Sequence, residues 1–302
     1  MTPALPIEPD LDRPQWVKSI PFLAVHLVAI AAPFLVPPTW ARIGLAAFVY
    51  ALLMFGITAG FHRYFSHRAF RTSRAFQFVL AVLGTLSVQK GVLWWAGHHR
   101  DHHRYSDGEK DVHSPVQRGF WWSHVGWILA ARYDRTRPER VKDLARYPEL
   151  VWLDRYGVAV PIAFVALLAA TGGLPAVLWG FFVPVVVCWH VTFSINSVAH
   201  VLGSRRYPTA DDSRNNPLLA LLTFGEGWHN NHHFFASTAN QGWFWWELDV
   251  SYLVLRTLSL FGIVWDLRTP PAHVRAGRLA RPAAALQEDG AAPGEVGVEH
   301  AL

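Results

Sequence analysis

Nine histidines stand in three closely spaced clusters and at one single position, and imidazole groups with such spacing are typical metal ligands. The clusters are HRYFSH with His62 and His67, HRDHH with His99, His102 and His103, and HNNHH with His229, His232 and His233, while His200 ends the motif NSVAH. In His-x-x-His-His, positions i, i+3 and i+4 share one helix face, so three imidazoles of one helix can converge on one point. Two such faces can enclose two metal ions. Neutral imidazole suits iron, zinc, copper and nickel, so ligand type alone does not identify the metal.

Helix geometry separates some of these histidines from their neighbours. His62 and His67 are five residues apart, about 140° round an ideal helix, which predicts that they serve different metals at the end of a helix. His98 lies about 100° from the face of His99, so we expect it not to be a ligand. Carboxylates commonly orient ligating imidazoles from outside. The candidates for that role are Glu226, Asp101 and Asp107.

The composition indicates a membrane protein. Of 302 residues, 52% are hydrophobic and only 16% are charged, with 15 Trp and 19 Phe. Apolar runs of about 17 to 25 residues can span a bilayer, and four candidates occur, at about residues 20–36, 43–61, 157–171 and 174–195. Pro37-Pro38 closes the first pair and Gly172-Gly173 the second, which predicts two membrane hairpins.

Four spans place all nine histidines on the same side of the membrane. The linkers on the opposite side hold a single basic residue, Arg42, whereas the histidine-bearing loops are rich in Arg, so the positive-inside rule predicts a cytoplasmic site and cytoplasmic termini. A bacterial inner membrane is the expected location. The basic residues show no nucleic-acid-binding spacing, so no nucleic-acid partner is predicted. The single cysteine, Cys188, lies in an apolar run and offers neither a disulfide nor a thiolate site.

Three further segments need an assignment. Residues 75–97 are apolar but interrupted by Gln77, Gln89 and Lys90, so an interfacial or partly buried segment is expected rather than a fifth span. Residues 242–267 combine a Trp cluster with spaced charges, which predicts an interfacial helix. Residues 269–302 are rich in Ala, Gly, Pro and Glu and are predicted to be a disordered tail.

The motifs HRYFSH, HHRDHHRYSD, NSVAH and GEGWHNNHH occur in an order that resembles the membrane fatty-acid desaturases, most closely the Δ9 acyl-CoA (stearoyl-CoA type) desaturases of bacterial kind. The resemblance covers about residues 20–268. It implies an all-α integral membrane protein, with four transmembrane helices in two hairpins and a cytoplasmic helical cap that carries the histidine boxes. The expected desaturase domain is residues 1–268.

The resemblance also implies an activity: O₂-dependent introduction of a cis double bond, at Δ9, into a long saturated acyl-CoA at a non-haem di-iron centre. The implied ligands of the two iron ions are the nine histidines, with Asn196 approaching one metal through water. The expected partners are a long-chain fatty acyl-CoA, the lipid bilayer and a separate electron donor of ferredoxin, rubredoxin or cytochrome b5 type. The chemistry agrees, because an unactivated methylene pair needs a redox metal and O₂ as oxidant.

The resemblance further suggests substrate contacts, at Gln89, Trp95, Thr192, Phe193 and Arg118. Lys90, Gly97 and His98 depart from the family pattern where the acyl-CoA enzymes contact the CoA headgroup, which weakens the acyl-CoA assignment more than the metal site. His113 and His124 are expected beside the metal ligands or the headgroup. His26, His190, His273 and His300 are expected to be structural.

Alternative functions stay open at this point. One is an acyl-lipid desaturase, a di-iron fatty-acid hydroxylase or an alkane monooxygenase, since hydroxylation and desaturation share the first hydrogen abstraction. Another is a non-catalytic membrane metal-binding protein. By resemblance, NSVAH and GEGWHNNHHFF favour desaturation.

Overall fold

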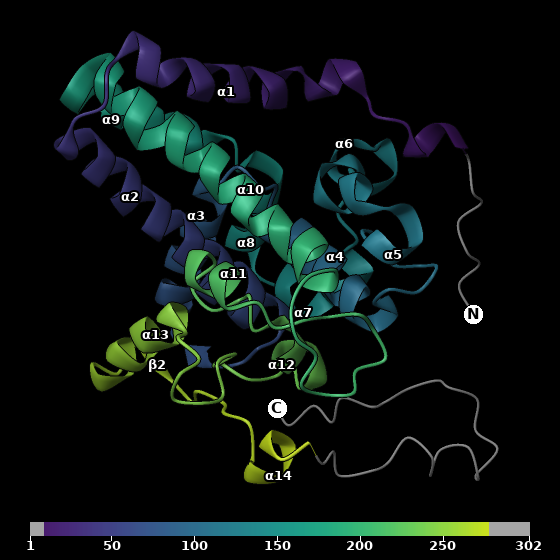
Figure 1. Cartoon of the computed structure of the whole chain (residues 1–302). Coiled ribbons are helices and arrows are strands. Elements are labelled where there is room, and N and C mark those ends of the chain that lie inside the picture. Colours follow the sequence, from purple (N-terminus) through teal and green to yellow (C-terminus); the bar gives the residue numbers. More distant parts are fainter. Residues whose placement is uncertain (1–8, 278–302) are drawn as a thin grey trace. The chain divides into compact units, whose positions relative to one another are not determined.

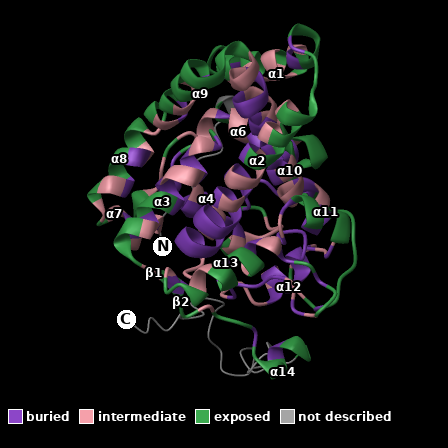
Figure 2. Cartoon of the chain, turned by 90° about the vertical axis from the view of Figure 1, so that its left-hand side faces the viewer, coloured by how far each residue is buried: buried purple, intermediate pink, exposed green. Residues whose placement is uncertain are grey.

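Three helical segments are long and apolar enough to cross a membrane. The computed structural model describes residues 9–277, and within them these segments are α1 (Trp16–Leu35), Trp40–Ser66, and Ala159–His200. Trp40–Ser66 joins α2 (Trp40–Phe55) to the π-helix η2 (Gly56–Ser66). Exposed residues dominate α9 (Ala159–Val177) in Figure 2, whereas α4 (Val92–Tyr105) and α12 (His229–Phe234) are largely buried. Many of the exposed residues of α9 are apolar, for example Ile162 and Leu167. A helix that faces lipid presents such an apolar surface.

The third segment folds back on itself at Gly173. This glycine has φ +61°, a left-handed conformation that L side chains rarely adopt. The Phe164 and Phe181 rings face each other across the turn at 6.5 Å, and Gly180 lies directly against Leu168. The segment therefore forms two antiparallel legs. The first is the part of α9 before Gly173. The second is the end of α9 followed by η6 (Leu178–Phe182), α10 (Val183–Ser197) and η7 (Val198–His200). Both predicted turns are present.

The π-helix η2 continues α2 past membrane length and into the core. Its backbone hydrogen bonds join residues five apart, rather than four as in an α-helix. The His67 amide, for example, donates to the His62 carbonyl (3.3 Å). Every residue of η2 is buried. It packs closely on α3 (Arg74–Leu86). The backbones are so close at Gly56 that an added methyl group would lie only 2.5 Å from the carbonyl carbon of Leu83.

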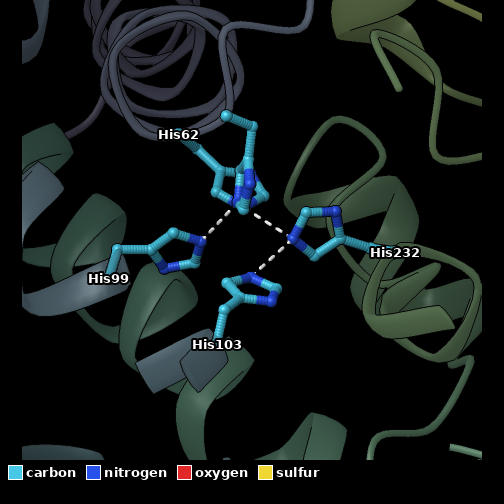
Figure 3. Close-up of side chains that lie close together, drawn as sticks. His62, His99, His103 and His232 are labelled. Atoms are coloured by element: carbon cyan, nitrogen blue, oxygen red, sulfur yellow. Dashed lines mark hydrogen bonds between the residues drawn. The ribbon is translucent and has the colours of Figure 1, made fainter. Parts of the chain in front are cut away.

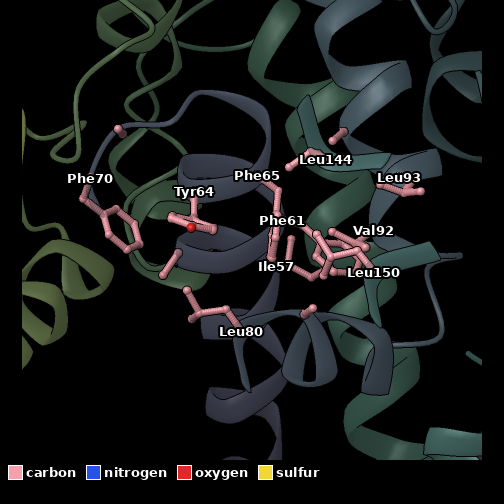
Figure 4. Close-up of a cluster of buried hydrophobic side chains, with 14 of the residues drawn as sticks. Ile57, Phe61, Tyr64, Phe65, Phe70, Leu80, Val92, Leu93, Leu144 and Leu150 are labelled. Carbon is pink, nitrogen blue, oxygen red and sulfur yellow. The ribbon is translucent and has the colours of Figure 1, made fainter. Parts of the chain in front are cut away.

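Aromatic and aliphatic side chains of η2 form the centre of a core cluster with side chains of α3, α4, α7 (Lys142–Ala145) and α8 (Pro148–Tyr156) (Figure 4). Phe61, Phe65, Leu80 and Leu150 are almost completely buried there. Burial of this apolar area is the main stabilising contribution at the base of the histidine-bearing helices. The other short helices between α4 and α9 lie outside this cluster and are α5 (Pro115–Arg118), η3 (Trp122–Gly126), α6 (Trp127–Leu129), η4 (Ala131–Tyr133) and η5 (Pro138–Arg140).

Residues 75–97 form no single span. They belong to two helices, α3 and α4, separated by residues 87–91, where Val88 and Lys90 have positive φ angles. The α3 helix buries Gln77, which accepts a hydrogen bond from the Tyr64 hydroxyl (2.9 Å). Polar groups thus interrupt this apolar stretch, as the sequence indicates.

The predicted helix over residues 242–267 is wrong in its extent. Only α13 (Val250–Leu260) is helical, followed by the strand β2 (Val264–Trp265), which pairs antiparallel with β1 (Arg71–Thr72). The Glu247 carboxylate accepts from the Trp243 amide (2.7 Å), and the Asp249 carboxylate accepts from the Tyr252 amide (2.9 Å) as the helix N-cap. These bonds hold the preceding residues in a loop.

The arrangement of these elements is shown in Figure 1, in which α11 (Pro217–Leu222), α12 and α13 follow α10 along the chain. Residues 270–277 form a separate unit with a short helix, α14 (Ala272–Arg275), inside the segment predicted to be disordered. The remainder of that predicted tail, residues 278–302, lies outside the described residues, as does His300.

Candidate metal centre

All nine histidines with ligand-like spacing come together in two clusters. The five-histidine cluster consists of His62, His67, His99, His103 and His232, and the four-histidine cluster consists of His102, His200, His229 and His233. Within each cluster the ligand nitrogens lie within 4.8 Å of one another. The side chains come from η2 and His67 directly after it, and from α4, η7 and α12, so residues far apart in the sequence meet at one place.

The ring nitrogens of the five-histidine cluster point toward one another (Figure 3). His232 Nε2 lies 3.0 Å from His62 Nε2 and 2.9 Å from His103 Nε2, and the Nε2 atoms of His67 and His99 are 2.8 Å apart. In the four-histidine cluster, Nε2 of His200 and His229 are 3.0 Å apart, and Nε2 of His102 and His233 are 3.3 Å apart.

Each of the two His-x-x-His-His motifs divides between the clusters. From α4, His99 and His103 enter the five-histidine cluster and His102 enters the other; from α12, His232 enters the five-histidine cluster, while His229 and His233 enter the other. The prediction that three imidazoles of one helix converge on one point is therefore wrong. In each helix, the first and last histidines of the motif, four residues apart, face one cluster. The middle histidine faces the other cluster.

The π-helix also corrects the expectation that His62 and His67 serve different metals. Both residues lie in the five-histidine cluster, with ring centroids 4.8 Å apart. The 140° separation holds for an α-helix, whereas i→i+5 hydrogen bonding brings residues five apart onto one face. The prediction for His98 agrees with the structure: its ring is outside both clusters, with Nδ1 bonded to the Trp94 carbonyl (2.9 Å).

Four histidines donate or share an Nδ1 hydrogen with a carboxylate. The pairs are His62 with Glu226 (2.5 Å), His102 with Asp111 (3.0 Å), His200 with Asp107 (2.8 Å) and His233 with Asp211 (2.7 Å). Two of these acids, Glu226 and Asp107, are among the predicted candidates. Asp101 is not paired with a histidine, because Arg137 (2.9 Å) and Arg140 (2.8 Å) bind it.

Asp111 and Asp211 are functional candidates that sequence reasoning misses. Asp111 follows His102 by nine residues, and Asp211 precedes His233 by 22, both beyond any helical spacing. The available signal is local: both acids stand in polar segments, DVHS and DDS, close to a histidine motif. Only the folded loops show which ring each carboxylate contacts.

These contacts test whether the residues fit a metal. A carboxylate on Nδ1 fixes the proton there, so Nε2 carries a lone pair. His102 and His233 both have carboxylates on Nδ1, yet their Nε2 atoms face each other at 3.3 Å. Two lone pairs cannot hydrogen-bond to each other, whereas a cation between them satisfies both. The donor set therefore fits a metal ion bound by neutral imidazoles.

The electrostatics favour neutral rings at five positions, whereas at His102 burial is outweighed by the nearby carboxylates of Asp111, Asp107 and Asp211, which raise the pKa of that ring. Burial, reinforced by neighbouring histidines, lowers the pKa of five of the ligand-like histidines well below the ordinary value: His67, His99, His103, His229 and His232. Burial opposes ionisation of Asp107, but its contacts with His200, the Asp212 amide and the Ser114 hydroxyl together outweigh burial and lower the pKa of Asp107 to about 2. Neutral imidazole beside an ionised carboxylate is the combination that metal binding requires.

A cavity of about 640 Å³ extends from the clusters between α1, α4 and α10. Four of the predicted substrate residues line it, namely Gln89, Trp95, Thr192 and Phe193. It reaches His99 and Asn196, and Asn196 also lines a small cavity of about 30 Å³ with five residues of the centre, His62, His99, His102, His229 and Glu226. Arg118 is not part of the lining, since it stacks on the Trp122 ring (3.3 Å) and pairs with Asp12 (3.3 Å).

The other histidines among residues 9–277 lie outside both clusters. His113 stacks on His102 with centroids 4.3 Å apart and lines the cavity. His124 bonds the Ser197 hydroxyl (2.9 Å) and His190 (3.1 Å), and His190 in turn bonds His26 (3.1 Å). The predicted role of His113 beside the ligands therefore agrees with its position, whereas His124 joins a chain of histidines between α10 and α1.

Comparison with known proteins identifies the family. The fatty acid desaturase model matches residues 38–266. An sn-1 stearoyl-lipid 9-desaturase of Synechocystis is 38% identical over 284 residues, which is 92% of this chain and 88% of that protein. Delta-9 acyl-lipid desaturase 1 of Arabidopsis thaliana is 38% identical, with 86% of this chain and 85% of the relative covered. An icosanoyl-CoA 5-desaturase of Limnanthes douglasii is 38% identical, with 84% and 72% covered. The protein with these two histidine clusters belongs to the fatty acid desaturase family.

Proposed function

We propose that this oxidoreductase is an O₂-dependent fatty acyl desaturase that introduces a cis double bond at carbon 9 of a long saturated acyl chain. The observation that carries the proposal is the meeting of nine histidines in two clusters at the end of a cavity of about 640 Å³. Family membership and relatives named as 9-desaturases support the reaction and its position.

In this proposal the nine histidines hold two iron ions, and Asn196 approaches one of them through water. Bound iron supplies, with O₂, the oxidising power that side chains lack. The protein keeps the imidazoles neutral, and Glu226, Asp107, Asp111 and Asp211 orient their rings through Nδ1.

The cavity is proposed to hold the acyl chain. Trp95, Phe193, Phe22 and Trp189 give it an aromatic lining, and Gln89 donates a hydrogen bond to Thr192 Oγ1 (3.2 Å) within the wall. Each buried CH₂ contributes about 0.8 kcal/mol, so a chain of about 18 carbons gains on the order of 10 kcal/mol. Such burial fixes which carbons stand beside the clusters. Arg118 lies outside this lining and is not included.

For the headgroup we propose an acyl lipid. Two relatives that align with 92% and 86% of this chain are named as lipid desaturases. By resemblance, Gly97 and His98 also replace an Arg-Asp pair that is associated with the CoA headgroup in the acyl-CoA enzymes. Acyl-CoA is the second candidate. It is supported by the icosanoyl-CoA relative and by two lysines in the cavity lining, Lys18 and Lys90, although both contact Asp134 at 3.4 and 2.8 Å.

We further propose that the four apolar legs cross a bacterial inner membrane, with the histidines and both termini on the cytoplasmic side. Electrons come from a separate donor of ferredoxin, rubredoxin or cytochrome b5 type. The Arg-rich segments beside the histidines support this orientation, and the apolar surfaces of α1 and α9 support contact with lipid.

The test is expression in a host that lacks the product, with gas chromatography and double-bond localisation on the total lipids. We expect cis-9 monounsaturated chains from the wild type and from His273→Ala, and none from His232→Ala, which removes a histidine of the five-histidine cluster. A hydroxylated chain without an alkene would contradict the proposal. Incubating purified protein, donor and O₂ with labelled acyl-CoA or labelled lipid identifies the headgroup.

A further inference from the structure

The two histidine clusters differ in their contacts with acidic residues. In the four-histidine cluster, three of the four rings carry a carboxylate on Nδ1: His102 with Asp111, His200 with Asp107 and His233 with Asp211. In the five-histidine cluster only His62 does, through Glu226. Across residues 9–277, no ion pair joins the other four rings of that cluster to an acid.

The three acids of the four-histidine cluster are held in place by the backbone. Asp107 accepts from the Asp212 amide (2.8 Å), and Asp111 accepts from the Asp107 amide (2.8 Å). Asp211 accepts from the Ser213 amide (3.0 Å). Carboxylates fixed in this way hold the rings of this cluster in one tautomer and one orientation, so three Nε2 lone pairs are preorganised toward the metal position.

The single acid of the five-histidine cluster is paired with a buried cation. Arg63 contacts Glu226 at 2.9 Å and Asp249 also at 2.9 Å, and the Arg63 side chain is 1% exposed. Although it is shared with Asp249, the buried guanidinium offsets part of the negative charge that Glu226 would offer to a cation. Rings without an Nδ1 carboxylate, such as His232, whose Nδ1 has no partner, are less strictly oriented.

We infer that the two clusters bind metal unequally: the four-histidine cluster takes the first metal ion and holds it about 100-fold more tightly than the five-histidine cluster holds the second. Loss of one carboxylate that binds a ligating histidine typically weakens metal affinity at least tenfold. The four-histidine cluster has two more such carboxylates than the five-histidine cluster, which gives about 100-fold. The fifth imidazole of the other cluster adds a donor but no negative charge. This inference rests on the proposed two-metal centre and deepens it.

The test uses full-length protein in detergent micelles, depleted of metal and reloaded with two equivalents of Fe²⁺ without O₂. Iron released to increasing concentrations of a ferrous chelator is then measured. We expect two phases of one equivalent each. Asp107→Asn and Asp211→Asn keep the side-chain size and an accepting oxygen. Each variant is expected to move the later phase, which is release from the four-histidine cluster, to a chelator concentration about 10- to 100-fold lower. The matched variant Glu226→Gln moves only the earlier phase.

Release of both ions from the wild type in one phase would overturn the inference, and so would a shift of the later phase by Glu226→Gln. Circular dichroism and size-exclusion profiles of the iron-free variants show that each is folded, and two separate Asp variants prevent one folding failure from deciding the result. Because iron release requires no turnover, unequal binding without an alkene product would reject the proposed reaction and leave this inference standing.

Discussion

At the scale of single residues, Arg63 is the most constrained charge in the described structure. It lies between Glu226 and Asp249, and its guanidinium also donates to the Ala239 carbonyl (2.7 Å). Glu226 in turn contacts the His62 ring and accepts a hydrogen bond from the side-chain amide of Gln241 (2.6 Å). A cation buried with two acids is satisfied only while all partners are present, so the network connects η2 to the segments on both sides of α12.

Replacing Arg63 with methionine is therefore expected to be strongly destabilising. The change leaves two buried carboxylates without their cation, which typically costs about 3 to 5 kcal/mol. Chemical unfolding in micelles, followed by circular dichroism, measures this loss. The matched control is Arg104→Met, because Arg104 is exposed and surface substitutions usually change stability by less than about 0.5 kcal/mol. Equal stability of the two variants would contradict the role of Arg63.

Sequence reasoning identifies the histidines well and their neighbours poorly. Histidine spacing selects eight members of the two clusters and excludes His98, and the family resemblance adds the ninth, His200. It misses the division between clusters, because that depends on how α4 and α12 are rotated toward each other. It also misses Asp111 and Asp211, since loop acids have no periodicity that relates them to a ring.

At the scale of elements, the packing of η2 against α3 determines where His62 and His67 stand. The contact is close because Gly56 and Gly84 remove side chains from it: a methyl group at Gly84 would lie 2.3 Å from the Phe61 ring. The two backbones approach there more closely than larger residues allow. The π-helical hydrogen bonding of η2 then brings both histidines to the same cluster.

Gly56→Ala is expected to destabilise the protein by about 1 to 3 kcal/mol, because the added methyl meets the α3 backbone, which cannot move aside cheaply. Gly44→Ala is the matched control. Gly44 lies in α2 with nothing within 4 Å of the added methyl, and alanine favours a helix by about 0.5 to 1 kcal/mol. Thermal unfolding should show opposite shifts; a lower melting temperature for both would mean that the close contact is not the cause.

Strong turn signals explain which elements the sequence predicts correctly. Pro37-Pro38 and Gly172-Gly173 mark both hairpin turns, and the structure has a turn at each. The helix predicted over residues 242–267 fails at its start, because Glu247 and Asp249 bind backbone amides and favour a loop. The π-helix could not be predicted, since apolar periodicity does not distinguish it from an α-helix over eleven residues.

At the scale of the whole molecule, the clusters connect four elements, since η2, α4, η7 and α12 all contribute rings. Bound metal is thus expected to stabilise the fold. At a free metal concentration of 100 times the dissociation constant, binding adds about 2.7 kcal/mol per site. Chelation should lower the melting temperature of the wild type and change that of His232→Ala by a smaller amount. Equal shifts would indicate that metal binds elsewhere.

Membrane topology gives the final test at this scale, because the proposal of four crossings makes an all-or-none statement about sidedness. If α1, α2, α9 and α10 all cross, the turns near Pro38 and Thr171 face the outside, while Lys110, which is exposed in the loop after α4, faces the cytoplasm. The natural chain suits cysteine labelling, since its one cysteine, Cys188, is fully buried. Pro38→Cys and Thr171→Cys should react with a membrane-impermeant maleimide in intact spheroplasts, and Lys110→Cys only in inverted vesicles. Labelling of positions 38 and 171 from opposite sides would mean that the chain between them crosses an odd number of times, which contradicts the proposal of four crossings.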